Sequence, residues 1–502
     1  MLRARRTHED LLELQSSNFK ELCRTFSKID HFGDDRSAFR PLGHRSEIVK
    51  AFETGAAYLP IAYRKAYVQF VRDVIPALLI RRKEIDRDQR YHYLERLLAP
   101  VYAHGPPYAE HDIRPQLRRF LAVVSNLYRS FNDPKKRASL KIHVVDTLPP
   151  LAFFQVVSNQ GPYTITTERM ARETGSEIGV VSLPASYRDH PILWSILAHE
   201  VCGHDVVHTD PTLIPELVKE VRKLFVGRNF LPSEKPDFNN LNALLWSYWI
   251  DEAVSDIYAI MNMGPTYALI LVALISSMVT RDQINGGRSR KALGKLPNRS
   301  EPLDKDGGNM RMDGHPTDIL RPYVALGAIE ALVSLSPHVR RAYSKAVEEA
   351  VDLTSGRQST ISFEGLVEVT HTNWVMINET VPLRSMQRAA KKVGKFIATH
   401  RLSAYSDSSV QDIETWDDTD ERIATKIAQY MLSGKSVIAQ GDDAQLLAGA
   451  NLAALSDPKR YRQCSKLLEL ALDDSFSRDP IWAGPRLDLV FSGAFYRERP
   501  IV

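Results

Sequence analysis

The sequence predicts an α+β fold in which helices predominate and one small sheet is present. Apolar residues recur every three or four positions over long stretches of the chain, which is the helical period. Between residues 141 and 184 this period gives way to short β-branched and aromatic runs, which are typical of strands. The composition, 44% hydrophobic and 25% charged over 502 residues, is that of a folded globular chain of about two to four domains.

We expect three consecutive regions along the chain. Residues 1–140 form a helical N-terminal region, with clear helical periodicity at 66–79 and 117–127. Residues 141–400 form a central region that contains the sheet, and residues 401–502 form a helical C-terminal region.

The central region holds the expected sheet and two helices of interest. The strand candidates within 141–184 are the runs KIHVVD, FFQVV, YTITT and IGVVSLP, which are bounded by Pro, Gly, Asn or Ser. A helix is predicted over 191–209, because Pro191 suits a first turn and Asp210-Pro211 follows as a stop signal. A second strongly periodic helix is predicted over 241–263.

Further helices are expected at 265–279, 319–335 and 339–353. Two irregular stretches separate or follow them, a basic, Gly-rich one at 281–315 and an acidic, Ser-rich one at 406–421. Loops of this length are usually functional lids or disordered segments.

Residues 257–280 are free of charge and long enough to cross a bilayer. Gly264-Pro265 interrupts them, and proline disfavours helix in the residue before it while fitting the first turn of a new helix. We therefore interpret the stretch as two buried helices, with a transmembrane span, and hence an intramembrane protease, as the alternative.

The net charge and the cysteine content limit which partners and which cellular compartment we expect. A net charge of +4 gives no reason to expect a nucleic-acid partner, and the Arg-rich start MLRARRTHEDLLELQ is not followed by the apolar core of a Sec signal peptide, so we do not expect secretion. Cys23, Cys202 and Cys464 are too few and too scattered for a disulfide framework, which favours reduced thiols and a cytoplasmic location. The oligomeric state is left open.

Four of the 15 histidines lie within residues 190–208. Two of them, His199 and His204, enclose Glu200 in the motif H-E-V-C-G-H. On a regular helix, residues five apart point about 140° apart and cannot converge on one ion. We therefore expect a π-bulge, which absorbs one extra residue, at the flexible Gly203.

A catalytic zinc ion takes three protein ligands and keeps one position open, so a third donor must come from another element. Glu252, in the sequence WSYWIDEAVSDIYAI, is our candidate, since it lies on a partly apolar helix face where an unpaired carboxylate would be costly. Asp256 or Asp251 would accept the second N–H of a ligating imidazole. Glu200 would be the general base.

Other pairings remain open. His204 and His208 have the four-residue spacing that a regular helix presents, with Asp205 in place of the carboxylate. Cys202 lies between the ligands and is interpreted as a buried thiol. Cobalt or manganese would suit the same ligands as zinc.

At this point the sequence resembles known peptidases. HEVCGH resembles the H-E-x-x-G-H helix of the dipeptidyl peptidase III family, and DEAVSD resembles the N-E-x-x-S-D motif of thermolysin-like gluzincins, with Asp251 in place of Asn. The resemblance extends over residues 178–256 and implies a zinc metallopeptidase of the zincin type that acts on peptides or proteins. It implies His199, His204 and Glu252 as ligands, Glu200 as base and Asp256 as their supporting partner. It also implies that the run IGVVSLP is an edge strand that pairs with the substrate.

The segment GHPTDILRPY adds three candidates: His315, Arg321 and Tyr323 could steady an oxyanion or hold a substrate carboxylate. The alternative function, from a different class, is a non-catalytic scaffold whose metal site is structural or vestigial.

Overall fold

The computed structural model describes residues 11, 13–31, 59–60, 63, 114–144, 148–155, 161–174, 177–285, 299–300, 311–355, 358–479 and 481–482. The chain divides into two compact units, each made of separate segments. The larger unit comprises Met1–His31, Asn126–Asp146 and His190–Ala471, and the smaller comprises Phe32–Ser125, Thr147–Asp189 and Leu472–Val502. These units do not follow the three consecutive regions expected from the sequence, because distant segments of the chain fold together.

The smaller unit contains the small sheet that the sequence predicts. Its strands are β1 (Leu151–Phe154), β2 (Tyr163–Ile165) and β3 (Val180–Leu183), in the order β1-β3-β2. β3 pairs parallel with β1 and antiparallel with β2, and both β1 and β3, which are mainly apolar, are buried along their whole length. Residues 141–144 form no strand, and 145–146 lie outside the described residues.

The expectation of an edge strand before the histidine helix is wrong. β3, which contains the run IGVVSLP, is the central strand of its sheet, because β1 and β2 occupy its two sides. Its backbone N–H and C=O groups are therefore used within the sheet, and this strand has no free side to which an extended peptide could add.

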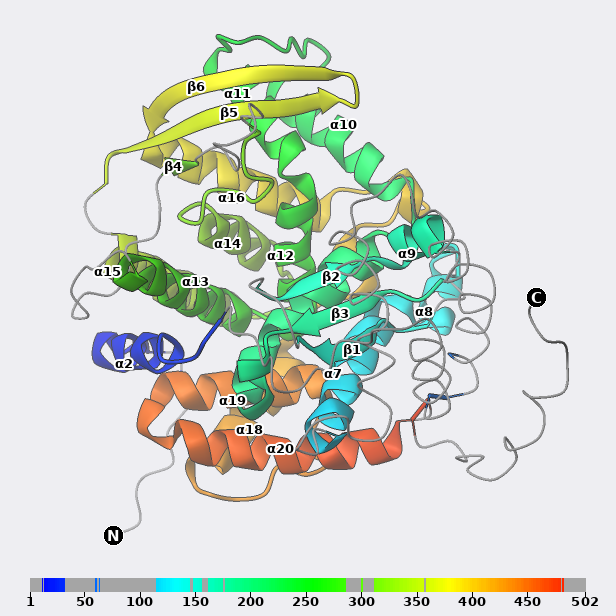
Figure 1. The fold of residues 1–502 in the computed structure, drawn as a ribbon, viewed down its shortest axis with the longest axis vertical. Helices are drawn as coiled ribbons and strands as arrows, with labels where there is room; N and C mark the ends of the chain where they lie inside the picture. Colours follow the sequence, from blue (N-terminus) through cyan, green and yellow to red (C-terminus); the bar gives the residue numbers. More distant parts are fainter. Residues whose placement is uncertain are drawn as a thin grey trace, which may run out of the picture. The chain divides into compact units, whose positions relative to one another are not determined.

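The larger unit is predominantly helical, which confirms the predicted fold class. Helix α7 (Arg114–Asn132) begins in the smaller unit and ends in the larger one, and helix α20 (Tyr461–Arg478) begins in the larger unit and ends in the smaller one. The other principal helices of the larger unit, shown in Figure 1, are α2 (Ser16–Phe26), α8 (Pro134–Ser139), α10 (Leu213–Val226), α11 (Phe238–Tyr248), α12 (Ile250–Met263), α13 (Thr266–Asn285), α14 (Arg321–Ala331), α15 (Pro337–Ser355), α16 (Leu383–Thr399), α17 (Val410–Ile413), α18 (Asp418–Leu432) and α19 (Asp443–Ser456).

A β-hairpin in the larger unit was not expected. β5 (Thr360–Thr370) and β6 (Asn373–Pro382) pair antiparallel and lie against α11 and α16, with the short β4 (Arg299–Ser300) parallel to β5 (Figure 1). In β5 the buried residues alternate with more exposed ones, so the run ISFEGLVEV carries the two-residue period of a half-buried strand. The sequence analysis expected strands only within 141–184, so this hairpin between the two long loops is an addition to the predicted fold.

The charge-free stretch 257–280 forms two helices, as predicted. α12 ends at Met263, Gly264 adopts a positive φ of 72° at the C-cap, and α13 begins at Thr266. None of the helices in the described part of the chain is both long enough and apolar enough to span a membrane.

The two expected loops differ from the prediction where they are described. α13 continues to Asn285, and most of the rest of 281–315 lies outside the described residues. Residues 406–421 include helix α17 and the start of α18, whose N-cap Asp417 forms a capping box with Asp420.

Candidate metal centre

The helix that carries the histidine motif is not a regular α-helix. It starts as a 3₁₀ segment, η4 (Pro191–Ile196), and continues as a π-helix, η5 (Ala198–Asp205). A π-helix brings residues five apart onto the same side, and the rings of His199 and His204 lie 4.8 Å apart between centroids, at 87° to each other. The predicted π-distortion is confirmed, and it extends over eight residues.

Gly203 allows η5 to approach α12 closely. A Cβ atom added to Gly203 would lie 2.3 Å from the Cβ atom of Ser255 on α12, which is far closer than two carbon atoms can come. We expected Gly203 for its backbone freedom, whereas the structure indicates that the missing side chain is what matters.

Glu252, in the first turn of α12, meets both histidines. Its Oε2 atom lies 3.2 Å from Nε2 of His199, and its Oε1 atom lies 3.4 Å from Nε2 of His204. One ligand atom from each of the three side chains falls within 4.8 Å of the others, and all three side chains are mostly buried. The structure therefore brings together the three residues that the sequence selected as ligands.

Asp256, one turn further along α12, orients His199. Its Oδ1 atom lies 3.0 Å from Nδ1 of His199 and accepts a hydrogen bond from the Tyr267 hydroxyl at 3.2 Å. Burial opposes ionisation of Asp256, but the guanidinium of Arg321 outweighs it and holds the pKa of this carboxyl at about 2. Because Nδ1 of His199 is engaged by Asp256, Nε2 is the nitrogen that faces Glu252.

Arg321 takes a different place from the one considered for it. Its Nε and Nη2 atoms donate hydrogen bonds of 2.9 and 2.8 Å to the two oxygens of Asp256, and the side chain is buried. A guanidinium used in this two-bond pair supports the carboxylate behind His199.

His208 does not join the three ligand candidates. Its Nε2 atom lies 3.1 Å from Oδ1 of Asp251, the same oxygen that lies 3.6 Å from Nδ1 of His204. Nδ1 of His204 is also 3.4 Å from the Ser255 hydroxyl. Asp251 thus contacts His208 and the Nδ1 atom of His204, whereas Glu252 faces the Nε2 atom of His204.

The charges of the cluster shift the pKa values of its members in opposite directions. Burial alone would lower the pKa of His204, but the negative charges of Glu252 and Asp251 raise it to about 10. The pKa of His199 is also raised, since Asp256 and Glu252 outweigh its burial. Burial opposes ionisation of Glu252, yet the histidines hold its pKa well below the usual range. The carboxylates therefore favour a positive charge between Glu252 and the two histidines, and a divalent cation would supply it.

His315 reaches the same carboxylate from another segment. Its Nε2 atom lies 3.3 Å from Oε1 of Glu252, and its Nδ1 atom lies 2.7 Å from Oδ1 of Asp313. The charge of Glu252 is the main cause that raises the pKa of His315 to about 9. Its side chain is 59% exposed, so it stands at the solvent side of the cluster. Sequence reasoning missed Asp313, although its position two residues before a histidine is typical of a side chain that bonds to a nearby turn.

The remaining candidates are distributed as follows. Glu200 is buried beside His199, and its charge contributes to the raised pKa of His204. Tyr323 is not brought to the cluster: its hydroxyl bonds to Gln387, and burial and the carboxylate of Asp352 raise its pKa to about 12. Cys202 is a buried free thiol whose Sγ donates to the Leu127 carbonyl at 3.3 Å.

Two imidazole nitrogens and a carboxylate oxygen form the donor set that zinc prefers in catalytic sites. Among the described residues, the only close contact given for the buried Oε2 atom of Glu252 is Nε2 of His199 at 3.2 Å, and this contact lacks the geometry of a regular hydrogen bond, which agrees with an oxygen and a nitrogen that face the same metal ion. The residues present therefore fit a zinc ion. Comparison with protein-family models, curated proteins and solved structures gives no match to this chain.

Proposed function

We propose that this protein is a zinc-dependent metallopeptidase in which His199, His204 and Glu252 hold the metal. The observation that carries the proposal is the convergence of these three ligand atoms within 4.8 Å, on a π-helix and the first turn of a second helix. A zinc ion held there would lower the pKa of a water molecule and polarise a substrate carbonyl group.

Glu200 is the general base in this proposal. It follows His199 directly on the π-helix, its charge acts on His204, and it is not one of the three residues whose ligand atoms converge. The carboxylate would accept a proton from the attacking water and then pass that proton to the nitrogen of the leaving amine.

His315 is the proposed donor to the substrate. With Nδ1 held by Asp313, its Nε2 atom lies 3.3 Å from Oε1 of Glu252, and its side chain is 59% exposed, so an N–H donor stands at the solvent side of the cluster. Such a donor would stabilise the negative charge that develops on the carbonyl oxygen of the scissile bond.

Asp256 and Arg321 position the site and do not touch the substrate. Asp256 fixes the orientation of the His199 ring, and Arg321 keeps Asp256 ionised in a buried position. The substrate class is a peptide or protein. Three buried free thiols agree with the cytoplasmic location proposed from the sequence.

The test compares the wild-type protein with Glu200→Gln. Both are loaded with zinc, their metal content is measured, and each is incubated with a mixed peptide library whose products are identified by mass spectrometry. We expect Glu200→Gln to keep one zinc per chain and to lose turnover by about 10²–10⁴-fold, because the base is removed and the ligands are not.

Two outcomes would contradict the proposal. If both proteins bind zinc and neither cleaves any peptide, the non-catalytic scaffold is the better description. If Glu200→Gln cleaves peptides at the wild-type rate, the hydrolysis does not depend on this centre.

A further inference from the structure

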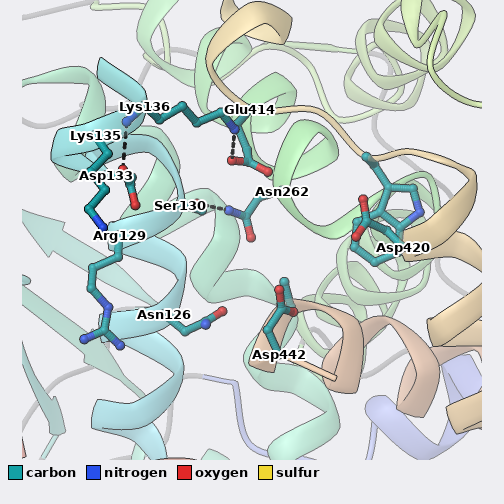
Figure 2. A pocket seen from close by; sticks show the side chains of 12 residues that line it. Asn126, Arg129, Ser130, Asp133, Lys135, Lys136, Asn262, Glu414, Asp420 and Asp442 are labelled. Carbon is teal, nitrogen blue, oxygen red and sulfur yellow. Dashed lines mark hydrogen bonds and ion pairs between the residues drawn. The ribbon is translucent and has the colours of Figure 1, made fainter. Parts of the chain in front are cut away.

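A second polar site lies in the larger unit, apart from the metal centre. It is a pocket of about 540 Å³, lined by the end of α7, by α8, by the last turn of α12 and by the segments that begin α18 and α19 (Figure 2). The partners that its charged side chains already have decide what else can bind. These side chains are Arg129, Lys135, Lys136, Asp133, Glu414, Asp420 and Asp442.

The cationic side chains of the pocket are engaged or face solvent. Nζ of Lys136 lies 2.9 Å from Oε2 of Glu414, with which it forms an ion pair. Arg129 has a partner of its own, and Lys135 is exposed in the same wall as Asp133. This side of the pocket therefore gives no reason to expect an anionic ligand.

Asp420 and Asp442 differ from these residues, because neither carboxylate forms an ion pair with a residue in the described part of the chain. Asp420 accepts hydrogen bonds from the backbone N–H of Asp417 and from Nε2 of Gln445, and Asp442 accepts one from the backbone N–H of Gln445. All of these donors are uncharged. Burial is the main cause that raises the pKa of both carboxyl groups, and the charge of Asp420 adds to the rise at Asp442. A ligand that brings positive charge would offset both effects.

Asn262, in the last turn of α12, is an independent sign of a ligand that donates hydrogen bonds. The residue is 5% exposed, and its Nδ2 atom donates a hydrogen bond to the Ser130 hydroxyl. Its Oδ1 atom is buried and has no hydrogen-bond partner among the residues that the structure describes, and Figure 2 shows it directed into the pocket. Because a carbonyl oxygen can only accept, its partner must be a donor or a cation.

Two carboxylates without a cationic partner would be balanced by a divalent metal ion or by an organic dication. Within the described part of the chain, three ligand atoms of Asp, Glu, His or Cys come within 4.8 Å of one another only at the metal centre. Glu414, Asp420 and Asp442 therefore do not converge on one point as metal ligands do. The volume of the pocket is in the range that holds small organic molecules.

Trp416 gives the pocket an apolar wall. Its Nε1 atom donates a hydrogen bond of 2.9 Å to Oε2 of Glu421, and its indole ring lies so close to Gly264 that a Cβ atom there would be 2.5 Å from it. A rigid aromatic ring beside carboxylates suits an aliphatic chain that ends in an ammonium group. α12 ends at Met263, so the negative end of its helix dipole also favours a cation here.

We propose that this pocket binds a short aliphatic diamine as its dication. One ammonium group would donate hydrogen bonds to Oδ1 of Asn262 and to the carboxylate of Asp442. The other would meet Asp420, and the carbon chain between them would pack on Trp416. Hydrogen bonds from an ammonium group to a carboxylate are about twice as strong as those between neutral groups.

The pocket is separate from the metal centre along α12. Asn262 lies ten residues after Glu252, which corresponds to about 15 Å along a helix axis. The inference therefore does not depend on the proposed peptidase function.

The test is calorimetric titration of the full-length protein, stripped of metal by a chelator, with 1,4-diaminobutane at neutral pH. We expect one binding site per chain, and an affinity for 1-aminobutane, which carries one charge, that is weaker by about tenfold or more. Asp442→Asn should weaken diamine binding by about tenfold or more, because asparagine can still cap α19 but has no charge. The matched control is Asp237→Asn, the same change at the exposed N-cap of α11, which should leave binding unchanged.

If Asp442→Asn does not fold, Asp420→Asn serves instead, with the same expected loss of affinity. The proposal is overturned if no heat is detected at millimolar diamine, if the monoamine binds as well as the diamine, or if the folded pocket variant binds like the wild type. Displacement of the diamine by an equal concentration of magnesium or calcium would also overturn it, because the site would then belong to a metal ion.

Discussion

Gly203 on η5 lies directly against Ser255 on α12, and these two elements carry the metal ligands. A Cβ atom at Gly203 would overlap both the Cα and the Cβ atom of Ser255, at 2.5 and 2.3 Å. Since His204 follows Gly203 and Glu252 precedes Ser255 by three residues, this contact sets the distance between ligands from the two helices.

We predict that Gly203→Ala destabilises the protein by about 1–3 kcal/mol and weakens zinc binding, because α12 must shift away from η5 to admit a methyl group. The measurements are denaturant unfolding and zinc content after dialysis. The control is Gly314→Ala, since a Cβ atom at Gly314 meets nothing within 4 Å. Equal stability and zinc content in the two variants would refute the role assigned to this contact.

Removal of the Arg321 side chain should expose the dependence of Asp256 on its partner. Arg321→Met leaves a buried carboxylate without its guanidinium, and we expect a loss of about 3–5 kcal/mol in the free energy of unfolding. The double variant Arg321→Met/Asp256→Asn should lose less than the sum of the two single changes. If Arg321→Met unfolds with a free energy near that of the wild type, Arg321 does not support Asp256 within the fold, and the prediction is wrong.

The ligand set is tested by a pair of alanine variants. Glu252→Ala removes the carboxylate whose two oxygens face the two histidines, so we expect the purified protein to lose its zinc. His208→Ala removes a side chain that contacts Asp251 and should keep one zinc per chain. Metal analysis that gives the opposite pattern would favour the pairing of His204 with His208.

Stability should depend on pH through Glu414. Its pKa of about 7 in the folded chain exceeds the ordinary value of 4.5, so the folded state binds the proton more tightly than the unfolded state. This contribution to stability is complete below pH 4.5 and is lost as the pH rises to about 7. The charged groups that face Glu414 are Lys136, which opposes the rise in pKa, and Asp420 and Asp442, which add to it.

Glutamine does not titrate, so we expect only the wild type to lose this contribution as the pH rises. The free energy of unfolding of Glu414→Gln, minus that of the wild type, should therefore increase by about 2–3 kcal/mol from pH 5 to pH 8. Urea unfolding at both pH values measures the change. Glu234→Gln, at an exposed position between α10 and α11, is the matched control and should show no such trend. A difference between wild type and Glu414→Gln that is the same at both pH values would contradict the prediction.

Local patterns in the sequence were sufficient to predict much of the fold and the ligand cluster. The break between α12 and α13 follows from the conformational limits of Gly264-Pro265, and the π-distortion follows from a five-residue spacing that an α-helix cannot reconcile with one ion. Both are properties of a few adjacent residues, so periodicity and sterics are enough to find them.

Features that depend on distant parts of the chain were not predictable in this way. The pair of Arg321 with Asp256 joins residues 65 positions apart, and nothing in either segment alone indicates that the guanidinium is used inside the protein. The order of the small sheet and the division into two discontinuous units depend equally on long-range packing. The β5–β6 hairpin is a different case, because the two-residue alternation of β5 is a local signal that lies within a mainly helical part of the chain.

The π-helix also sets how this centre responds to insertions and deletions. Loss of a single codon between His199 and His204, at Val201 or Cys202, would leave two histidines four positions apart, the spacing that an ordinary α-helix presents on one side. A single in-frame deletion thus distinguishes the present π-helix from a regular α-helix that would carry the same two histidines on one side. The same deletion would turn every residue after it by about 100° around the axis and would break the register with the neighbouring helix.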